Sequence, residues 1–355
     1  MYSMRVHMDV TPVWNPNPRG IGTYIVHLVE NLLGLGVEVH AAFKFSRLQR
    51  LMLARRLPRL ARKKVIPFWM GKVELFHGTN RFLARGRFPK VLTVHDMIEF
   101  YDSVDFWFPP GKKRRMRQKT ERCFEMAPEA VIAVSEFARS EIARFVDYPR
   151  ERVHVIHHGI PAWARPYSEE ECLGVLARYG LSQGRYLAFV GQPESRKNLG
   201  LVLGAMARAR GVGLLVAGGR LEPAEAQLAA ELGLGPRITE LRFVPGQELG
   251  PLLAGSLALA FPSKYEGFGL PVIEAMACGA PVITSTHPAT AEAAGGAGIL
   301  VQSDDVEGFT LAIERLSADP GFRDELVEKG LARASGFSWK KTARKTMEVY
   351  KLAAG

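Results

Sequence analysis

The chain has 355 residues, of which 47% are hydrophobic and 23% charged, and its net charge is +11. This length exceeds what one hydrophobic core commonly supports and predicts two domains, while the even composition excludes a disordered or low-complexity protein. The first ten residues lack the apolar stretch of a signal peptide and no later run approaches the ~18 apolar residues of a membrane span, so we expect a cytosolic protein.

The N-terminal half alternates short apolar runs with segments of helical periodicity, which predicts strands and helices in βαβ order. Strands made almost wholly of apolar residues indicate a parallel sheet that helices cover on both faces. The predicted strands are 5–10, 37–43, 73–77, 91–95, 130–134 and 152–157, and the predicted helices are 23–34, 46–61, 112–126 and 136–146.

The C-terminal half repeats this pattern, with strands over 186–190, 212–217, 238–244, 257–261 and 281–284 and helices over 199–210, 223–232 and 271–278. We therefore predict an α/β protein of two doubly wound, Rossmann-like lobes that face each other across a cleft. The boundary is expected near residue 165, because Pro161 and Pro166 bracket a linker there. Ligands of such open sheets bind outside the carboxyl ends of the strands.

The positive charge is concentrated in the first half. Residues 1–165 contain 28 Lys+Arg and 15 Asp+Glu, a net charge of +13, whereas residues 166–355 contain 19 and 21, a net charge of −2. Two basic clusters, 47–64 and 112–122, hold much of the excess. Leucines alternate with the bases of the first cluster, so a helix there would suit an anionic membrane surface. The alternative is a solvated Arg-rich helix whose leucines face the core.

Cysteines are few and lie far apart, at Cys123, Cys172 and Cys278. Their odd number and unpaired spacing indicate neither a disulfide framework nor a zinc site. We expect buried, reduced thiols.

The most informative stretch is 263–279, which follows the predicted strand 257–261 and combines a glycine-rich loop with a helix. Pro271 suits the first helical position, and Gly279 suits a left-handed cap just past the end. The glycines ahead of the helix allow backbone amides to approach a phosphate at its N-terminus. Glu266 in the loop and Glu274 in the first turn then face one ligand, one suiting sugar hydroxyls and the other a ribose diol.

This stretch resembles family 4 of the glycosyltransferases, and in particular its bacterial mannosyltransferase-like and rhamnosyltransferase-like members. The resemblance implies a retaining enzyme with the GT-B fold, in which the helix start holds the donor diphosphate, Glu274 contacts the ribose and Glu266 contacts the transferred sugar. We assign donor binding to Gly20, Gly22, Gly191, Gly267, Phe268, Gly269, Leu270 and Glu274.

The resemblance extends over nearly the whole chain and implies a division of labour between the lobes. Residues 1–165 are expected to bind the acceptor, and residues 166–339 the nucleotide sugar. In this fold the last helix crosses back, so residues 340–355 are expected to join the first lobe.

A second loop, 190–198, follows the first strand of the C-terminal half and carries Arg196 and Lys197 just before a helix. Cations there can neutralise a diphosphate and stabilise the charge that develops on it as the glycosidic bond breaks, a task that otherwise falls to a divalent metal. The chain contains no Asp-x-Asp motif, so we expect no metal and no other cofactor. The family uses an Arg and a Lys in this loop, but the position after Gly191, where many members carry Arg, is Gln192 here.

Two segments of the first half complete the predicted site. The loop 17–24, with Gly20 and Gly22, looks like the family's first glycine-rich loop, although Gly-x-Gly alone is a weak signal. His95 and Asp96 end a strand in a segment similar to one in which the family places a His near the transferred sugar. We assign catalysis to Glu266, Lys197, Arg196 and His95, and the acceptor side to Asp96 and Ser135, the last of which is first of all a helix cap.

The sequence thus predicts a metal-independent retaining hexosyltransferase, with GDP-mannose the favoured donor and a saccharide or lipid-linked acceptor in cell-surface glycan synthesis. Expected partners are the nucleotide sugar, the acceptor and an anionic membrane surface at the inner face of the cell membrane, but no nucleic acid, since the basic lobe has no recognition motif or stacking platform. The alternatives are a GT-B-fold sugar-nucleotide epimerase and a non-catalytic nucleotide-sugar binder.

Overall fold

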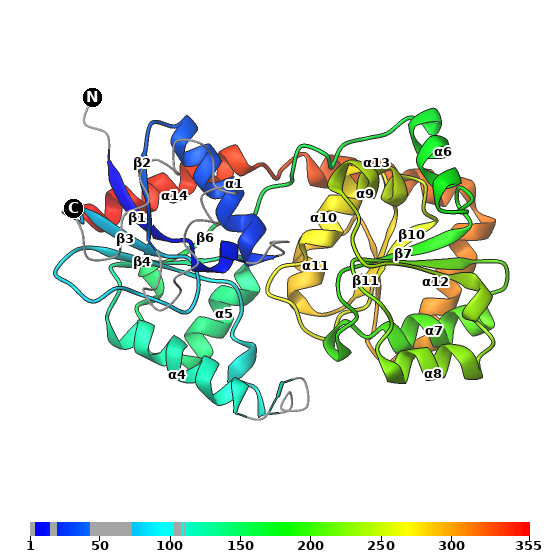
Figure 1. Cartoon of the computed structure of the whole chain (residues 1–355), viewed down its shortest axis with the longest axis horizontal. Coiled ribbons are helices and arrows are strands. Elements are labelled where there is room, and N and C mark those ends of the chain that lie inside the picture. The colour runs from blue at the N-terminus through cyan, green and yellow to red at the C-terminus, as the bar shows by residue number, and fades with distance from the viewer. Residues whose placement is uncertain (1–3, 15–19, 43–72, 103–107, 110) are drawn as a thin grey trace. The chain divides into compact units, whose positions relative to one another are not determined.

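The computed structural model describes residues 4–14, 20–42, 73–102, 108–109 and 111–355. It divides the chain into two compact units, unit 1 with residues 1–159 and 338–355 and unit 2 with residues 160–337 (Figure 1). Within the described ranges each unit contains one parallel sheet of six strands with helices between the strands. The predicted α/β class with two doubly wound lobes is confirmed.

The sheet of unit 1 has the strand order β2-β1-β3-β4-β5-β6. Its strands are β1 (Arg5–Asp9), β2 (Glu38–Ala42), β3 (Leu75–Gly78), β4 (Lys90–Val94), β5 (Ala130–Ala133) and β6 (Val153–Val155), and its helices are α1 (Ile21–Gly34), α4 (Lys112–Glu125), α5 (Glu136–Phe145) and α14 (Trp339–Ala354). Short 3-10 turns lie at η1 (Thr11–Trp14), η2 (Ile98–Phe100) and η4 (Arg150–Arg152). The predicted helix 46–61 and the first basic cluster lie outside the described residues.

Two helices from opposite ends of the chain share the core of unit 1. Helix α1 buries Tyr24, Leu28 and Leu32, which recur at the spacing of one helical face. Helix α14 packs beside it and buries Trp339 and Tyr350 in the same cluster (Figure 1). The C-terminal segment is therefore a structural part of unit 1.

The sheet of unit 2 has the strand order β12-β11-β10-β7-β8-β9. Its strands are β7 (Tyr186–Val190), β8 (Gly213–Ala217), β9 (Ile238–Leu241), β10 (Ala258–Phe261), β11 (Val282–Ser285) and β12 (Ile299–Val301). Its helices are α6 (Glu169–Arg178), α7 (Leu199–Arg208), α8 (Pro223–Glu231), α9 (Gly246–Ala254), α10 (Leu270–Ala277), α11 (Pro288–Ala294), α12 (Val306–Ala318) and α13 (Pro320–Ala334), with 3-10 turns at η5 (Ser195–Lys197) and η6 (Gly235–Arg237).

This strand order creates a topological switch point. From β7 the chain moves outward to β8 and β9 on one side, then returns to β10 and moves outward to β12 on the other. The carboxyl ends of β7 and β10 therefore form the topological switch point, where open α/β sheets bind their ligands.

Several helices of unit 2 were not predicted from the sequence. Helix α9 contains Gly246, Gly250 and Pro251, which all lower helical propensity, yet it forms because Leu252 and Leu253 are buried. Helix α6 begins with a capping box between Ser168 and Glu171 that the sequence analysis did not use. The predicted strand 238–244 ends three residues earlier, at Leu241.

Three further findings bear on the sequence predictions. All three cysteines are buried and free, as expected. In the described part of the chain, no helix combines the length and the apolar character that a bilayer span needs. Nor do three or more His, Cys, Asp or Glu side chains gather anywhere in these described ranges in a group that could hold a metal ion.

Candidate functional site

Two loops of unit 2 meet at the switch point. The first, 191–198, follows β7 and leads through η5 into α7, and the second, 262–269, follows β10 and leads into α10. The two strands are paired in parallel, with Leu187 opposite Ala258 and Ala188 opposite Leu259. The two loops that the sequence analysis singled out therefore leave the same edge of the sheet as neighbours.

Helix α10 begins as a phosphate-binding helix would. Its N-cap is Gly269, whose φ of 113° lies in the region that favours glycine. The first helical residue is Leu270, so the prediction that Pro271 comes first and that Glu274 lies in the first turn was wrong by one residue, and Glu274 begins the second turn. Gly279 has a φ of 81° just past the helix end, as predicted.

Glu266 is held by groups from both loops. The Arg196 guanidinium donates from Nη1 to the Glu266 carboxylate at 2.8 Å and to the Tyr265 carbonyl at 3.1 Å. The Ser263 hydroxyl donates to the same carboxylate oxygen at 3.1 Å. Arg196 also pairs with Glu194 at 2.8 Å. Two carboxylates thus neutralise Arg196 and fix it beside Glu266, which the sequence pattern did not predict.

Lys197 lies at the same edge of the sheet. Its Nζ donates to the Val190 carbonyl at 3.3 Å and stands 5.1 Å from the centroid of the Phe261 ring. Gly191 makes room for it, because a β-carbon at residue 191 would lie 2.5 Å from Nζ. Gly191, which was assigned to donor binding from the sequence, therefore leaves free the space that the tip of the lysine occupies.

Burial raises the pKa of Glu274 to about 8, and the charge of Lys197 opposes that rise. The carboxyl group of a ligand-free protein therefore keeps its proton up to mildly basic pH. A protonated carboxyl group can donate one hydrogen bond and accept others, whereas the carboxylate only accepts. The charge of Glu274 thus depends on what else occupies the site.

The raised pKa makes stability depend on pH. Glutamate ordinarily has a pKa of 4.5, so the unfolded chain ionises at lower pH than the folded one. Between these two pKa values the native state binds one more proton than the unfolded chain. The free energy of unfolding therefore falls as pH rises from about 4.5 through about 8. We expect the melting temperature of the ligand-free wild type, relative to that of Glu274→Gln, to fall between pH 5 and pH 8 and then to level off. Differential scanning fluorimetry measures both melting temperatures. If their difference stays constant between pH 5 and pH 8, the pKa of Glu274 is not raised.

In unit 1, His95 follows β4 and is almost fully buried. Its Nε2 lies 3.0 Å from the Thr79 carbonyl, which can only accept, so Nε2 carries the hydrogen. Burial lowers the pKa of His95 to about 4, so the ring is neutral near pH 7 and Nδ1 is an acceptor. The rings of Tyr24 and His158 pack against it at centroid distances of 4.9 and 5.4 Å. No sequence pattern indicated Thr79 or Tyr24 as neighbours of His95.

Other predicted residues of unit 1 have structural partners. Asp96 pairs with Arg81 at 2.7 Å, and Arg81 also binds the buried Glu99. The Ser135 hydroxyl accepts from the Ala138 amide at 2.9 Å and caps α5, as predicted.

Of the two predicted glycines in this unit, only one lies ahead of the helix. Gly20 is the N-cap of α1, with a φ of 52°. Gly22 is the second residue of α1 and is buried, so it is part of the helix and not of a loop. The loop residues 17–19 lie outside the described part of the chain.

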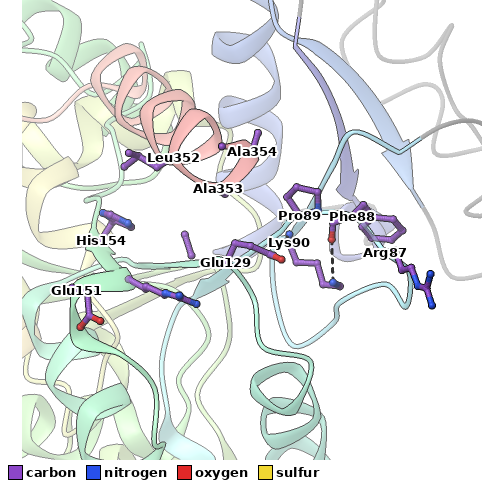
Figure 2. A pocket seen from close by; sticks show the side chains of 13 residues that line it. Arg87, Phe88, Pro89, Lys90, Glu129, Glu151, His154, Leu352, Ala353 and Ala354 are labelled. Carbon is purple, nitrogen blue, oxygen red and sulfur yellow. Dashed lines mark hydrogen bonds between the residues drawn. The ribbon is translucent and has the colours of Figure 1, made fainter.

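A hollow of about 730 Å³ opens at the opposite edge of the unit 1 sheet, where β4, β5 and β6 begin. In Figure 2 residues 87–90 lie on one side of it and Glu151 and His154 on the other, with Leu352 to Ala354 of α14 above. Its charged lining is mixed, with Arg87, Lys90 and Arg152 beside Glu129 and Glu151. These residues differ from the predicted site residues, and the hollow lacks the features of an anion site at a helix start.

Comparison with known proteins points to one family. Residues 184–319 match the family model for glycosyl transferases group 1, and residues 42–162 match the model for glycosyltransferase family 4. The chain is 32% identical to O-antigen chain mannosyltransferase B of Escherichia coli, in an alignment that covers 78% of this chain and 74% of that protein. It is 30% identical to an MMP alpha-(1->4)-mannosyltransferase of Mycolicibacterium hassiacum, over 76% of this chain and 67% of that protein.

Solved structures share the fold over almost the full length. Sucrose-phosphate synthase from Thermosynechococcus elongatus superposes with a TM-score of 0.78 at 21% identity, covering 98% of both chains. Anabaena Alr3699/HepE in complex with UDP-glucose superposes with a TM-score of 0.76 at 16% identity, covering 98% of this chain and 99% of that one. These likenesses show the two-lobed GT-B fold.

Proposed function

This chain belongs to glycosyltransferase family 4, and from that premise we propose that it is a retaining hexosyltransferase that uses GDP-mannose and needs no metal ion. One observation carries the proposal. The loop with Lys197 and the loop with Glu266 leave neighbouring strands at the switch point of unit 2 and are joined by the Arg196–Glu266 ion pair. The start of α10 lies at the end of the second loop.

The residues divide the work as follows. The Lys197 ammonium and the amides at the start of α10 bind the diphosphate and stabilise its charge as it leaves. Glu266 and His95 orient the hexose, and Glu274 binds the ribose. Arg196 acts chiefly on Glu266, because its guanidinium holds that carboxylate in place. No protein nucleophile is needed.

Transfer then follows as a substitution on one face of the sugar. The bond between the anomeric carbon and the phosphate oxygen breaks, and the acceptor oxygen bonds to the same face of that carbon. The acceptor proton passes to the leaving phosphate oxygen, so the diphosphate is both leaving group and base. The neutral His95 accepts a hydrogen bond from a sugar hydroxyl through Nδ1.

The acceptor is a saccharide or a lipid-linked glycan of the cell surface. The mannosyltransferase names of the two relatives favour mannose as the transferred sugar, and the name of the first favours an O-antigen chain as acceptor. We place the reaction in the cytoplasm at the inner face of the cell membrane.

Donor identity is tested by a thermal-shift screen of GDP-mannose against UDP, ADP and dTDP sugars. A ligand that binds only the native state raises its stability with the logarithm of concentration over Kd, so the true donor gives the largest shift at equal concentration. The anomeric configuration of the product, read by NMR with a soluble acceptor, tests retention. An equal response to all four nucleotides argues against a specific donor site.

Assays with the same protein and sugar nucleotides distinguish the alternative functions. A sugar-nucleotide epimerase would change the sugar nucleotide in the absence of any acceptor. A non-catalytic binder would give the thermal shift but no product with any acceptor. Activity that disappears with a metal chelator and returns with a divalent metal contradicts the metal-free reaction.

We also propose that α4 brings the enzyme to anionic membranes. Six bases of this helix are exposed, namely Lys112, Arg114, Arg115, Arg117, Lys119 and Arg122. Such a cationic face attracts an anionic surface by about 1 kcal/mol per base. We expect Arg114→Gln/Arg115→Gln/Lys119→Gln to weaken sedimentation with vesicles of anionic lipid while transfer to a soluble acceptor continues. An equal loss of both properties counts against a membrane role.

A further inference from the structure

Asn198 occupies an unusual backbone position at the end of the first loop. It follows Lys197 directly, ends η5 and precedes the first residue of α7. Its φ of 60° and ψ of 41° are left-handed, and in the described part of the chain only Ala127 shares a positive φ among residues other than glycine. Asparagine tolerates this conformation better than most residues. The left-handed residue thus stands at the junction between the turn that carries Lys197 and the first residue of α7.

The side chain of Asn198 does not cap the helix it precedes. Instead its amide nitrogen donates to the Pro262 carbonyl at 3.2 Å and to the Ser303 carbonyl at 2.7 Å. Both partners are carbonyls that can only accept, so the chemistry fixes which amide atom faces them. One side chain therefore joins the loops that follow β7, β10 and β12.

Ahead of Glu266, the backbone carbonyls of three consecutive residues, 261–263, each accept a side-chain hydrogen bond. The Phe261 carbonyl accepts from the Thr284 hydroxyl at 2.8 Å, and the Ser263 carbonyl accepts from the Ser285 hydroxyl at 2.6 Å. The Pro262 carbonyl between them accepts from Asn198. The donors to Phe261 and Ser263 both belong to β11. Of these three hydrogen bonds, the one from Asn198 connects the stretch to the loop that carries Lys197.

We propose that Asn198 is a positioning residue that sets the Lys197 ammonium against Glu266 and the start of α10. This rests on the proposed function of the site. The Asn198 amide nitrogen is engaged by two backbone carbonyls. It acts by fixing the distance between the cation loop and the carboxylate loop, so that the diphosphate meets both in a prepared geometry.

The test is Asn198→Gly, which allows the left-handed backbone and removes the side chain together with its two amide hydrogen bonds. We expect GDP binding, measured by titration calorimetry, to weaken about tenfold and kcat with the identified donor to fall about tenfold, while loss of the two hydrogen bonds lowers the melting temperature by only a few degrees. Ala127→Gly is the matched control, because it relieves the other positive φ far along the sequence from the site. It should leave GDP binding and kcat as they are.

A double-mutant cycle with Lys197→Met separates positioning from a general structural role. If Asn198 acts through Lys197, Asn198→Gly costs less than about threefold once Lys197 has lost its charge. Additive losses in the two variants would overturn the proposal, as would wild-type GDP affinity in Asn198→Gly. If the wild type itself binds no nucleoside diphosphate among GDP, UDP, ADP and dTDP, the proposed function fails instead, and the two failures are thus distinguishable.

Discussion

Replacing Lys197 with methionine is expected to lower kcat/KM by about 10²–10³-fold, because it removes a preorganised cation from the place where negative charge develops. Methionine keeps an unbranched apolar side chain, one atom shorter than that of lysine, beside the Phe261 ring over which Nζ stands. The loss should therefore appear in catalysis and in diphosphate affinity and not in folding. Steady-state kinetics with the identified donor, together with the melting temperature, provide the measurement.

Lys264→Met is the matched control for this variant. Lys264 lies in the neighbouring loop and is exposed, and its contact with Arg196 is made by the backbone amide, which donates at 2.7 Å. The substitution removes the same charge within the same part of unit 2. If Lys264→Met reduces kcat/KM as much as Lys197→Met does, the loss reflects the net positive charge near the site and not the position of the Lys197 ammonium.

The second large effect is expected from Gly191→Ala. A methyl group at residue 191 would lie 2.5 Å from the Lys197 Nζ, so the ammonium must leave its position beside the Val190 carbonyl. A displacement of about 1 Å in a charge-stabilising group costs on the order of 10²-fold in rate. We expect kcat/KM to fall by about that factor and diphosphate affinity to fall with it.

Alanine at residue 191 also strains the backbone, since the φ of Gly191 is 113°. Gly211→Ala controls for this, because Gly211 has a φ of 78° but nothing within 4 Å of its would-be β-carbon. Both variants should lose about 1–2 kcal/mol of stability from the left-handed backbone. Only Gly191→Ala should lose activity, and equal activity in the two variants would show that the approach to Lys197 is unimportant.

The sequence predicted part of this arrangement of acidic and basic residues. The sequence marked Glu266, Glu274, Arg196 and Lys197 as candidates. It assigned Arg196 to the diphosphate, whereas the structure pairs that guanidinium with Glu266 and Glu194. The pairing joins residues 70 positions apart, and no local pattern encodes a contact over that separation.

What the sequence determined by itself was set by short-range physics. Strands such as Ala258–Phe261 are entirely apolar because both faces of a parallel sheet are covered, and that pattern is legible over a few residues. The same holds for Gly269 and Gly279 at the ends of α10, where a left-handed φ favours glycine. The fold class and the choice of the two candidate loops follow from such signals.

Only the tertiary structure decided which of these pieces meet. It set β7 beside β10, brought Lys197 to Gly191, and directed the Asn198 amide to the carbonyls of Pro262 and Ser303. It also made a helix of α9 despite Pro251, because burial of Leu252 and Leu253 outweighs poor propensity. Strand order and long-range hydrogen bonds depend on packing between distant segments, so they were decided by the folded chain and not by any stretch of its sequence.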